Sequence, residues 1–293
     1  MMEVQPEQLR ALSAIIDHGG FEAAANSLDI TQSAVSQRLL AMERQFGRPM
    51  LRRGKPPKLT DAGQLMLRFA RHTELLTADL VTELDAEPGY ELPAVSIVVN
   101  ADSLATWVLP ALAPLAAQLR LELLREDQDH SLEVLRQGDA IAAITSESKA
   151  APGCSSTLLG IVRYLPICSP EFAARWFEGG ANVAALAKAP TVIYDRKDDL
   201  QDRYLRLRSA TPPEPPRHYV PASSDFMQAI ELGFGWGMVP RMQAAALLES
   251  GALQRIAPRG HVDVPLYWQQ WRLGSVSLKL VADAIKGAAK SLR

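Results

Sequence analysis

The sequence has little of what a disulfide scaffold, a metal centre or a membrane protein needs. Only Cys154 and Cys168 are cysteines, and they lack metal-ligand spacing. The five histidines are scattered. No apolar run reaches the roughly 20 residues that span a bilayer, and the N-terminus shows no secretory signal. We therefore expect a cytoplasmic protein without metal or cofactor and without a membrane partner. Its two thiols are predicted to be reduced and partly buried, with a redox-sensitive pair as the alternative.

The usual signatures of an enzyme are also missing. The chain contains no glycine-rich dinucleotide or phosphate loop that opens a helix, and no GxSxG nucleophile motif. The segment 233–237, GFGWG, resembles a phosphate loop only loosely, because it leads into a predicted strand. We therefore predict no catalytic residue, and an enzyme is only the second functional class that we consider.

Positive charge is concentrated in one short stretch. The whole chain carries a formal charge of -2. Residues 38–58 contain seven basic side chains and one acid, Glu43. A local basic patch on an otherwise acidic protein is typical of a surface that contacts DNA.

That stretch overlaps a predicted helix-turn-helix at 21–46. Val35, Leu39, Met42 and Phe46 recur with the period of a helix that buries one side. Thr31 is a candidate N-cap, so the helix is expected to begin near residue 32, with small polar side chains in its first turn. Two apolar helical stretches precede it, which predicts three compact helices. The alternative is an ordinary amphipathic helix in a bundle.

The next two segments predict a wing and a long helix. Residues 48–60, RPMLRRGKPPKLT, are too rich in proline and glycine for a helix and suggest a basic hairpin loop. Thr60 can cap a helix that runs to about residue 83. An apolar stripe on this helix favours pairing with a second subunit over packing on its own domain. The residues predicted for this dimer contact are Leu65, Phe69, His72 and Leu76.

From residue 92 the pattern becomes that of an α/β protein. Apolar runs alternate with helical stretches in two similar sets, which predicts a mostly parallel sheet in two lobes. We expect strands at 95–99, 121–124, 140–144, 190–194, near 219, at 237–239 and at 265–273. Helices are expected at 102–118, 131–137, 199–207, 224–232 and from 274 to the C-terminus.

Polar residues at the predicted strand ends suggest a ligand cleft between these lobes. Helix N-termini there would favour a carboxylate, and several acids would favour a cation, so that a basic amino acid fits both. Each residue taken singly is equally compatible with a cap or a solvated loop group. The candidate effector-binding residues are Asn100, Asp102, Ser103, Trp107, Glu126, Asp127, Thr145, Asp195, Ser224 and Asp225.

The run ITQSAVSQRLLAMERQFG, followed by wing residues and by Leu59-Thr60 and Ala62-Gly63, resembles the winged helix-turn-helix of LysR-type transcriptional regulators. Leu40 is a departure, since many relatives have Lys or Arg there, and we expect it to cost a phosphate contact and to alter the detailed base readout. The resemblance implies double-stranded operator DNA as a partner. The implied DNA-binding residues are Thr31, Gln32, Ser33, Ser36, Gln37, Arg38, Arg52, Arg53 and Lys55.

The segments VNADSLATWVLPALAP, EDQDHS and GFGWGMVP resemble the ArgP/LysG (IciA) branch of that family. This resemblance implies a periplasmic-binding-protein-like effector domain with crossing strands, an effector that is lysine or arginine, and control of a basic-amino-acid exporter or a related gene. It also implies a homodimer or homotetramer that contacts RNA polymerase. It places effector contacts at 100–103, at Glu126, Asp127 and Gln128, and near 194–196.

The expected division is a winged helix-turn-helix at 1–59, a linker helix at 60–88 and an effector-binding domain at 89–293. Within the last, lobe I spans about 92–165 and 266–293, and lobe II about 166–265. An architectural DNA-binding protein and a regulator with a different effector remain the alternatives. Which basic amino acid binds, and whether it activates or represses, stays open.

Overall fold

The first unit of the chain is a small helical domain with a hairpin. The structure is a computed structural model that describes residues 4–52, 54–84, 92–125 and 128–292. Three helices pack around one apolar core that includes Leu12, Ala24, Val35 and Met42. The three compact helices and the hairpin that the sequence predicts are confirmed. The elements are α1 (Pro6–Asp17), α2 (Phe21–Ser27), α3 (Gln32–Phe46), β1 (Leu51–Arg52) and β2 (Lys58–Leu59).

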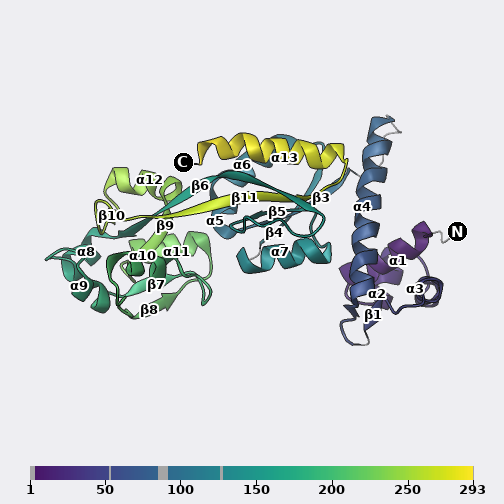
Figure 1. Cartoon of the computed structure of the whole chain (residues 1–293), viewed down its shortest axis with the longest axis horizontal. Coiled ribbons are helices and arrows are strands. Elements are labelled where there is room, and N and C mark those ends of the chain that lie inside the picture. The colour runs from purple at the N-terminus through teal and green to yellow at the C-terminus, as the bar shows by residue number, and fades with distance from the viewer. Residues whose placement is uncertain (1–3, 53, 85–91, 126–127, 293) are drawn as a thin grey trace.

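The linker helix α4 (Asp61–Glu83) stands between this unit and the rest of the molecule (Figure 1). Its predicted N-cap is confirmed, because the Thr60 hydroxyl accepts a hydrogen bond from the Gly63 N–H at 3.0 Å. Leu67 is buried in the core of the first unit, whereas Leu75 is buried in the core of the α/β portion. The helix therefore belongs to two cores at once.

The α/β portion has two lobes joined by two long strands (Figure 1). Lobe I, next to α4, contains a helical run that begins at residue 101 and a C-terminal helix that lies along its sheet. Lobe I consists of β3 (Ala94–Val99), α5 (Ala101–Ser103), η1 (Leu104–Val108), α6 (Leu109–Leu112), η2 (Ala113–Leu115), β4 (Arg120–Arg125), α7 (Gln128–Gln137), β5 (Ala142–Thr145), α13 (Val276–Ala288) and η3 (Ala289–Ser291).

Lobe II lies at the opposite end of the molecule from the winged unit (Figure 1). It consists of α8 (Pro170–Trp176), α9 (Val183–Lys188), β7 (Thr191–Ile193), α10 (Leu200–Arg208), β8 (Arg217–Tyr219), α11 (Ser223–Glu231), β9 (Gly237–Pro240), α12 (Arg241–Ser250) and β10 (Gln254–Arg255). The sequence did not predict α8, α9, α12 or β10.

The joining strands correct the expectation of a mostly parallel sheet. Strand β6 (Cys154–Cys168), which the sequence did not predict, pairs antiparallel with β11 (Val262–Trp271) over most of its length. Among the described strands of this sheet, only β4, β3 and β5 run parallel, and the strand order is β10-β6-β11-β5-β3-β4 with β9 also on β6. Since one strand leaves lobe I and the other returns, the two must run in opposite directions. The sheet is mixed for that reason.

Strand β6 also decides between the two readings of the cysteines. Cys154 and Cys168 are free, buried and at opposite ends of this strand. At about 3.3 Å per residue they lie on the order of 40 Å apart, far beyond disulfide reach. Burial raises the pKa of the Cys154 thiol to about 11 and that of Cys168 to about 12. The reduced, unreactive pair is therefore the correct interpretation for this fold.

The helix predicted at 102–118 is shorter and irregular. It runs from Ala101 to Leu115 and contains a π-turn at Leu104–Val108. Pro110 and Pro114 lack the N–H that a regular α-helix would use here, which is consistent with the irregular hydrogen bonding of this segment.

Helix α4 is held against lobe I at two helix ends. At the C-terminal end of α7, Arg68 donates to the Arg136 carbonyl at 3.2 Å, and Arg71 donates to the Gly138 carbonyl at 2.9 Å. At the N-terminal end of α13, Asp79 accepts from the Val276 N–H at 2.9 Å. Cations at a helix C-terminus and a carboxylate at an N-terminus both complement the helix dipole.

One arginine also joins the winged unit to lobe I. Arg71 forms an ion pair with Asp139 of lobe I at 3.1 Å and another with Asp17, the last residue of α1, at 2.7 Å. A Cβ atom on Gly138 would press against Arg68, so α4 and lobe I approach as closely as a glycine allows. Three parts of the chain are therefore in contact at a single guanidinium.

In the part of the chain that the structure describes, no helix combines the length and apolarity that crossing a bilayer requires. The same residues contain no group of three or more His, Cys, Asp or Glu side chains placed to hold a metal ion.

Candidate functional site

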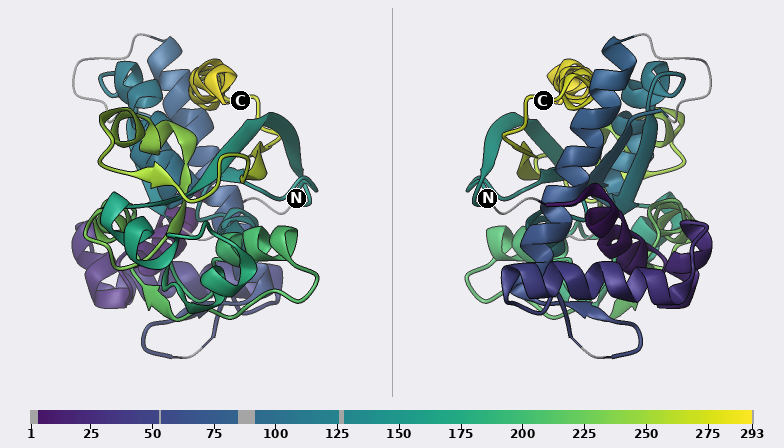
Figure 2. Two further views of the ribbon diagram at one scale, coloured as in Figure 1. Left: turned by 90° about the vertical axis from the view of Figure 1, so that its left-hand side faces the viewer. Right: turned by 90° about the vertical axis from the view of Figure 1, so that its right-hand side faces the viewer.

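The exposed side of α3 is the candidate DNA-reading face. Its N-cap is Thr31, whose hydroxyl accepts a hydrogen bond from the Ala34 N–H at 3.2 Å. Val35, Leu39 and Met42 are buried on the inner side. The helix bounds that the sequence predicts are confirmed. Figure 2 (right) shows α3 lying across one end of the molecule with the hairpin loop below it.

The predicted DNA-binding residues of α3 gather on the outer side of its first two turns. Gln32, Ser33 and Gln37 are exposed, as is the capping Thr31. Ser36 and Arg38 are half-buried, and the Ser36 hydroxyl donates to the Gln32 carbonyl at 3.0 Å, so it keeps its acceptor capacity for a ligand. Leu40 is 47% exposed. These positions allow contact with a groove, and their binding roles stay predictions.

The hairpin β1–β2 forms the wing. Arg52 lies on it and is 68% exposed, with Asp61 3.9 Å away. Lys55 is exposed in the loop, and Arg53 lies outside the described residues. The acid of the basic stretch has a structural function, since the Glu43 carboxylate accepts a hydrogen bond from the Met50 N–H at 2.7 Å. That bond fixes the wing to α3.

A cavity of about 350 Å³ lies between the two lobes. This volume is in the range of small-molecule sites. Four carboxylates line it, Asp102, Asp195, Asp198 and Asp199, against two cations, Lys197 and Arg203. The remaining lining residues are Asn100, Ala101, Tyr164, Tyr194, Leu200, Phe226, Met238, Val239, Pro240 and Gln243.

Asp102 is the central acid on the lobe I side. Its carboxylate accepts from the Tyr164 hydroxyl at 2.8 Å and from the Ser223 hydroxyl at 3.2 Å. Ser223 begins α11 in lobe II and also accepts from the Gln243 amide at 3.3 Å. Burial raises the pKa of Asp102, although the two hydroxyl donors partly oppose the shift. The same burial, together with the nearby Asp102 charge, holds the pKa of Tyr164 well above its ordinary value.

Asp198 is the corresponding acid in lobe II. It accepts from the backbone N–H of Tyr194 at 3.1 Å and from that of Leu200 at 3.0 Å. Burial raises the pKa of Asp198, the two backbone donors lower it, and the charge of Asp102 raises it further. Asp195 closes the same loop by accepting from the N–H of Lys197 at 2.7 Å.

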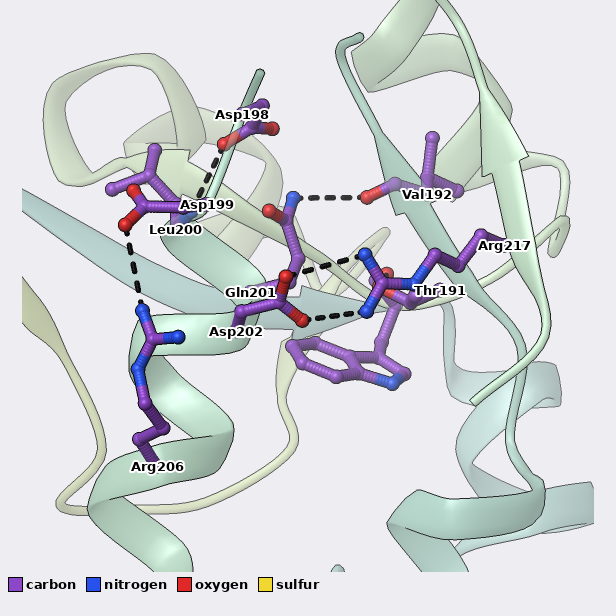
Figure 3. A network of polar contacts seen from close by, with 10 residues as sticks. Thr191, Val192, Asp198, Asp199, Leu200, Gln201, Asp202, Arg206 and Arg217 are labelled. Carbon is purple, nitrogen blue, oxygen red and sulfur yellow. Dashed lines mark hydrogen bonds and ion pairs between the residues drawn. The ribbon is translucent and has the colours of Figure 1, made fainter. Parts of the chain in front are cut away.

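A polar network on α10 fixes this loop to the lobe II sheet (Figure 3). The buried Gln201 amide donates to the Val192 carbonyl of β7 at 2.9 Å. Asp202 and Arg217 of β8 form a bidentate pair at 2.7 and 3.2 Å. Asp199 pairs with Arg206 at 3.4 Å on the exposed side of the helix. Asp198 is thus carried by a rigid element.

The structure brings together only some of the sequence-predicted effector residues. Asn100, Asp102 and Asp195 line the cavity. Glu126 and Asp127 lie outside the described residues, as does the side chain of Gln128. The other predicted residues, which are absent from the lining, are Ser103, Trp107, Thr145, Ser224 and Asp225.

These five side chains have other surroundings. Ser103 and Trp107 are buried inside lobe I. Thr145 is fully buried, and its hydroxyl accepts from the Glu147 N–H at 3.2 Å. Ser224 and Asp225 are exposed, and the Ser224 hydroxyl donates to the Asp225 carboxylate at 3.2 Å. The residue of α11 that faces Asp102 is instead Ser223.

Sequence reasoning missed Tyr164, Asp198, Arg203 and Gln243. Tyr164 lies on β6, which was not predicted, and Gln243 lies on the equally unpredicted α12. Asp198 follows a predicted strand, and the turn residues 195–199, DRKDD, were the available signal.

The predicted dimer stripe on α4 divides in two. Leu65, Phe69 and Leu76 are exposed large apolar residues on one side of the helix, together with Leu80. His72 lies elsewhere: its ring packs edge-on against Trp271 of lobe I, with 5.3 Å between centroids. Burial lowers the pKa of His72, and the Arg68 charge adds to that shift. His72 is therefore part of the contact between α4 and lobe I.

Comparison with known protein families gives two matches. The model described as the bacterial regulatory helix-turn-helix protein, lysR family, matches residues 6–64. The model of the LysR substrate binding domain matches residues 91–290.

Similar proteins cover nearly the whole chain. The HTH-type transcriptional regulator LysG of Mycobacterium tuberculosis is 41% identical over 285 residues, covering 97% of this chain and 93% of that protein. The crystal structure of ArgP from Mycobacterium tuberculosis has a TM-score of 0.88 at 41% identity, covering 97% of both chains. Full-length LysG from Corynebacterium glutamicum, solved with bound effector Arg, has a TM-score of 0.78 at 37% identity, covering 99% of both.

Proposed function

From the premise that the chain belongs to the LysR family of bacterial regulatory helix-turn-helix proteins, we propose that the effector of this DNA-binding transcription regulator is a basic amino acid. The observation that carries the proposal is the excess of carboxylates around the interlobe cavity. A cation in a partly desolvated site needs acids close by. The relative solved with bound Arg supports the same class of ligand.

The ligand's other end is an α-amino acid group, and the cavity offers matching charges. Arg203 and Lys197 lie on its wall with the acids. Arg203 also donates to the Asp263 carbonyl of β11 at 3.3 Å, which holds its guanidinium in place. Cations on the wall suit a carboxylate, so the cavity has complementary groups for both ends of lysine or arginine.

Calorimetric titration with lysine and arginine tests this proposal. Alanine and glutamate serve as controls for the amino-acid moiety and for the sign of the side-chain charge. We expect saturable binding of at least one basic amino acid and none of glutamate. Equal binding of all four, or binding of none, would refute the proposed effector class.

On the DNA, we propose that α3 enters a major groove and that the wing contacts flanking phosphates. The exposed Gln32, Ser33 and Gln37 and the accessible Arg52 support this geometry. A basic-amino-acid exporter or a related metabolic gene is the proposed target, RNA polymerase the proposed partner, and the cytoplasm the proposed place of action.

Substituting the wing arginine tests the phosphate contact. Arg52→Ala should weaken operator binding about 3- to 10-fold and reduce the slope of log affinity against log salt by about 1. Lys290→Ala removes an equal charge from the exposed C-terminal end of the chain and is the control. If both variants lose affinity equally, overall charge and not the wing determines binding.

For the assembly, we propose a homodimer or homotetramer in which two subunits pair through the exposed apolar side of α4. The winged unit does not cover this side of α4. The α4 residues that it buries, such as Leu67 and Ala70, lie on the opposite side of the helix. We also propose the domain division 1–59, 60–88 and 89–293.

A further inference from the structure

Two of the cavity acids come from opposite lobes. Asp102 belongs to the first turn after β3 in lobe I, whereas Asp198 belongs to the loop between β7 and α10 in lobe II. Both line the same cavity, and the charge of one disfavours the charge of the other. Two like charges that face each other across an empty cleft oppose its closure.

Each carboxylate keeps free acceptor capacity. Asp102 receives two hydroxyl donors, and Asp198 receives two backbone N–H donors and a side-chain hydrogen bond from Gln201 that lowers its pKa. An ionised carboxylate has about four lone-pair sites, so each acid can accept further hydrogen bonds. A guanidinium carries five N–H donors and an ammonium three, and neither has an acceptor.

Asn100 supplies an independent sign that a donor-rich group belongs here. Its side chain lines the cavity but is only 7% exposed. Its Oδ1 atom has no hydrogen-bond partner among the described residues. A buried amide oxygen without a partner is costly unless a ligand or water donates to it. Asn100 is two residues before Asp102 in the chain and lines the same cavity.

We propose that the cationic end of the effector lies between Asp102 and Asp198 and bridges the two lobes. The inference rests on the proposed function and adds to it the position of the cation and the reason why binding changes the conformation. The cation replaces repulsion between the lobes by two charge-assisted contacts. A neutral ligand of the same shape fills the cavity but does not produce that change.

Arginine and citrulline distinguish these cases, because citrulline has nearly the same shape without the charge. In the wild-type protein, arginine should bind about 10- to 100-fold more tightly than citrulline. Asp198→Asn should reduce arginine affinity by about the same factor and change citrulline affinity less than about threefold. Asp283→Asn is the matched control, because this acid lies on α13, exposed and paired with Lys279.

The combination of Asp102→Asn with Asp198→Asn tests the bridge itself. If both acids hold one cation, the loss in the double variant should be clearly smaller than the product of the two single losses. Independent, multiplicative losses would mean that the acids contact different groups. Thermal melting of each variant checks that it folds.

Proton release provides a readout that needs no variant. Burial raises the pKa of Asp102 and of Asp198, so a bound cation should expel protons at mildly acidic pH. Calorimetry in two buffers of different ionisation enthalpy should show proton release with arginine and none with citrulline.

The outcomes separate the two proposals. Binding of arginine without preference over citrulline, or equal losses of both ligands in Asp198→Asn, would overturn the bridge and leave the effector class intact. Failure of the wild-type protein to bind either basic amino acid would overturn both.

Discussion

Asp79, in the second half of α4, caps the first turn of α13: its carboxylate accepts from the backbone N–H of Val276 at 2.9 Å and of Ser277 at 3.3 Å, and from the Ser277 hydroxyl. Asp79 and Ser277 are both buried, so the bonds between them are shielded from bulk water. A helix that carries the DNA-binding unit thus completes a helix of the effector-binding portion.

Removing this cap should loosen α13 first. Asp79→Ala removes the acceptor of two backbone N–H groups, of which the Ser277 N–H is buried, and should destabilise the protein by about 2 kcal/mol. Urea unfolding measures the loss, and hydrogen exchange at 276–279 should rise before exchange elsewhere. Asp61→Ala, on the same helix but 98% exposed, is the control and should change little. Uniform acceleration of exchange would contradict a local capping function.

The junction of wing and linker helix requires a glycine. A Cβ atom on Gly63 would collide with the Met50 carbonyl oxygen, which itself accepts from the Thr60 N–H at 2.9 Å. Gly63→Ala should therefore displace the wing, cost about 1–3 kcal/mol and weaken operator binding.

The matched control is Gly287→Ala in α13, where an added Cβ meets nothing. Gly287 lies in the last turn of α13 without a positive φ, so this change should stabilise by up to about 0.5–1 kcal/mol. Unfolding experiments on both variants check the opposite signs, and equal effects would refute the steric argument.

The exposed side of α4 should decide the oligomeric state. Leu65→Ser and Leu76→Ser remove apolar surface from the proposed interface, and each should raise the dimer dissociation constant about 10-fold or more. Leu207→Ser, on a 71% exposed leucine of α10, is the control. Sedimentation of the three variants gives the answer, and an unchanged dimer in the first two would place the interface elsewhere.

Arginine affinity should fall as the pH is lowered. Burial raises the pKa of Asp102 and of Asp198 above their ordinary values, so acid protonates them before a surface aspartate, and a protonated carboxyl attracts a cation less. Titrations from about pH 8 down to about pH 5 should show weakening for arginine and a flat profile for citrulline. The stability of the unliganded protein should depend on pH in the opposite direction. The free energy of unfolding should fall as the pH rises through the raised folded-state pKa values of these two acids.

Local signals in the sequence were sufficient for the winged unit and the linker helix. Thr31 and Thr60 each cap a helix by accepting from the N–H three residues further on, which is a local interaction. Val35, Leu39 and Met42 recur with the helical period and are buried on one side of α3. The dimer contact on α4 was predicted less accurately. Periodicity shows which residues share a side of the helix, but not which part of the protein packs against them. His72 therefore joined the exposed residues in the prediction, although it packs on Trp271.

The cavity depended on long-range pairing that no local pattern encodes. Asp102 could be predicted because it follows a buried strand, but its partners Tyr164 and Ser223 come from 62 and 121 residues further along. Strand β6 was missed because its burial alternates irregularly as it passes from one lobe to the other. The cavity residues of lobe I and lobe II can be recognised as neighbours only once the path of β6 between the lobes is known.

Arg71 limits how the winged unit can rotate relative to lobe I. Its guanidinium is bonded to Asp17 at 2.7 Å and to Asp139 at 3.1 Å, and neither pair tolerates a shift of more than about an ångström. A rotation of lobe I about the linker helix must therefore give up one of the two acids outright. The junction between the winged unit and lobe I therefore has few preferred orientations, each defined by which of these two ion pairs is formed.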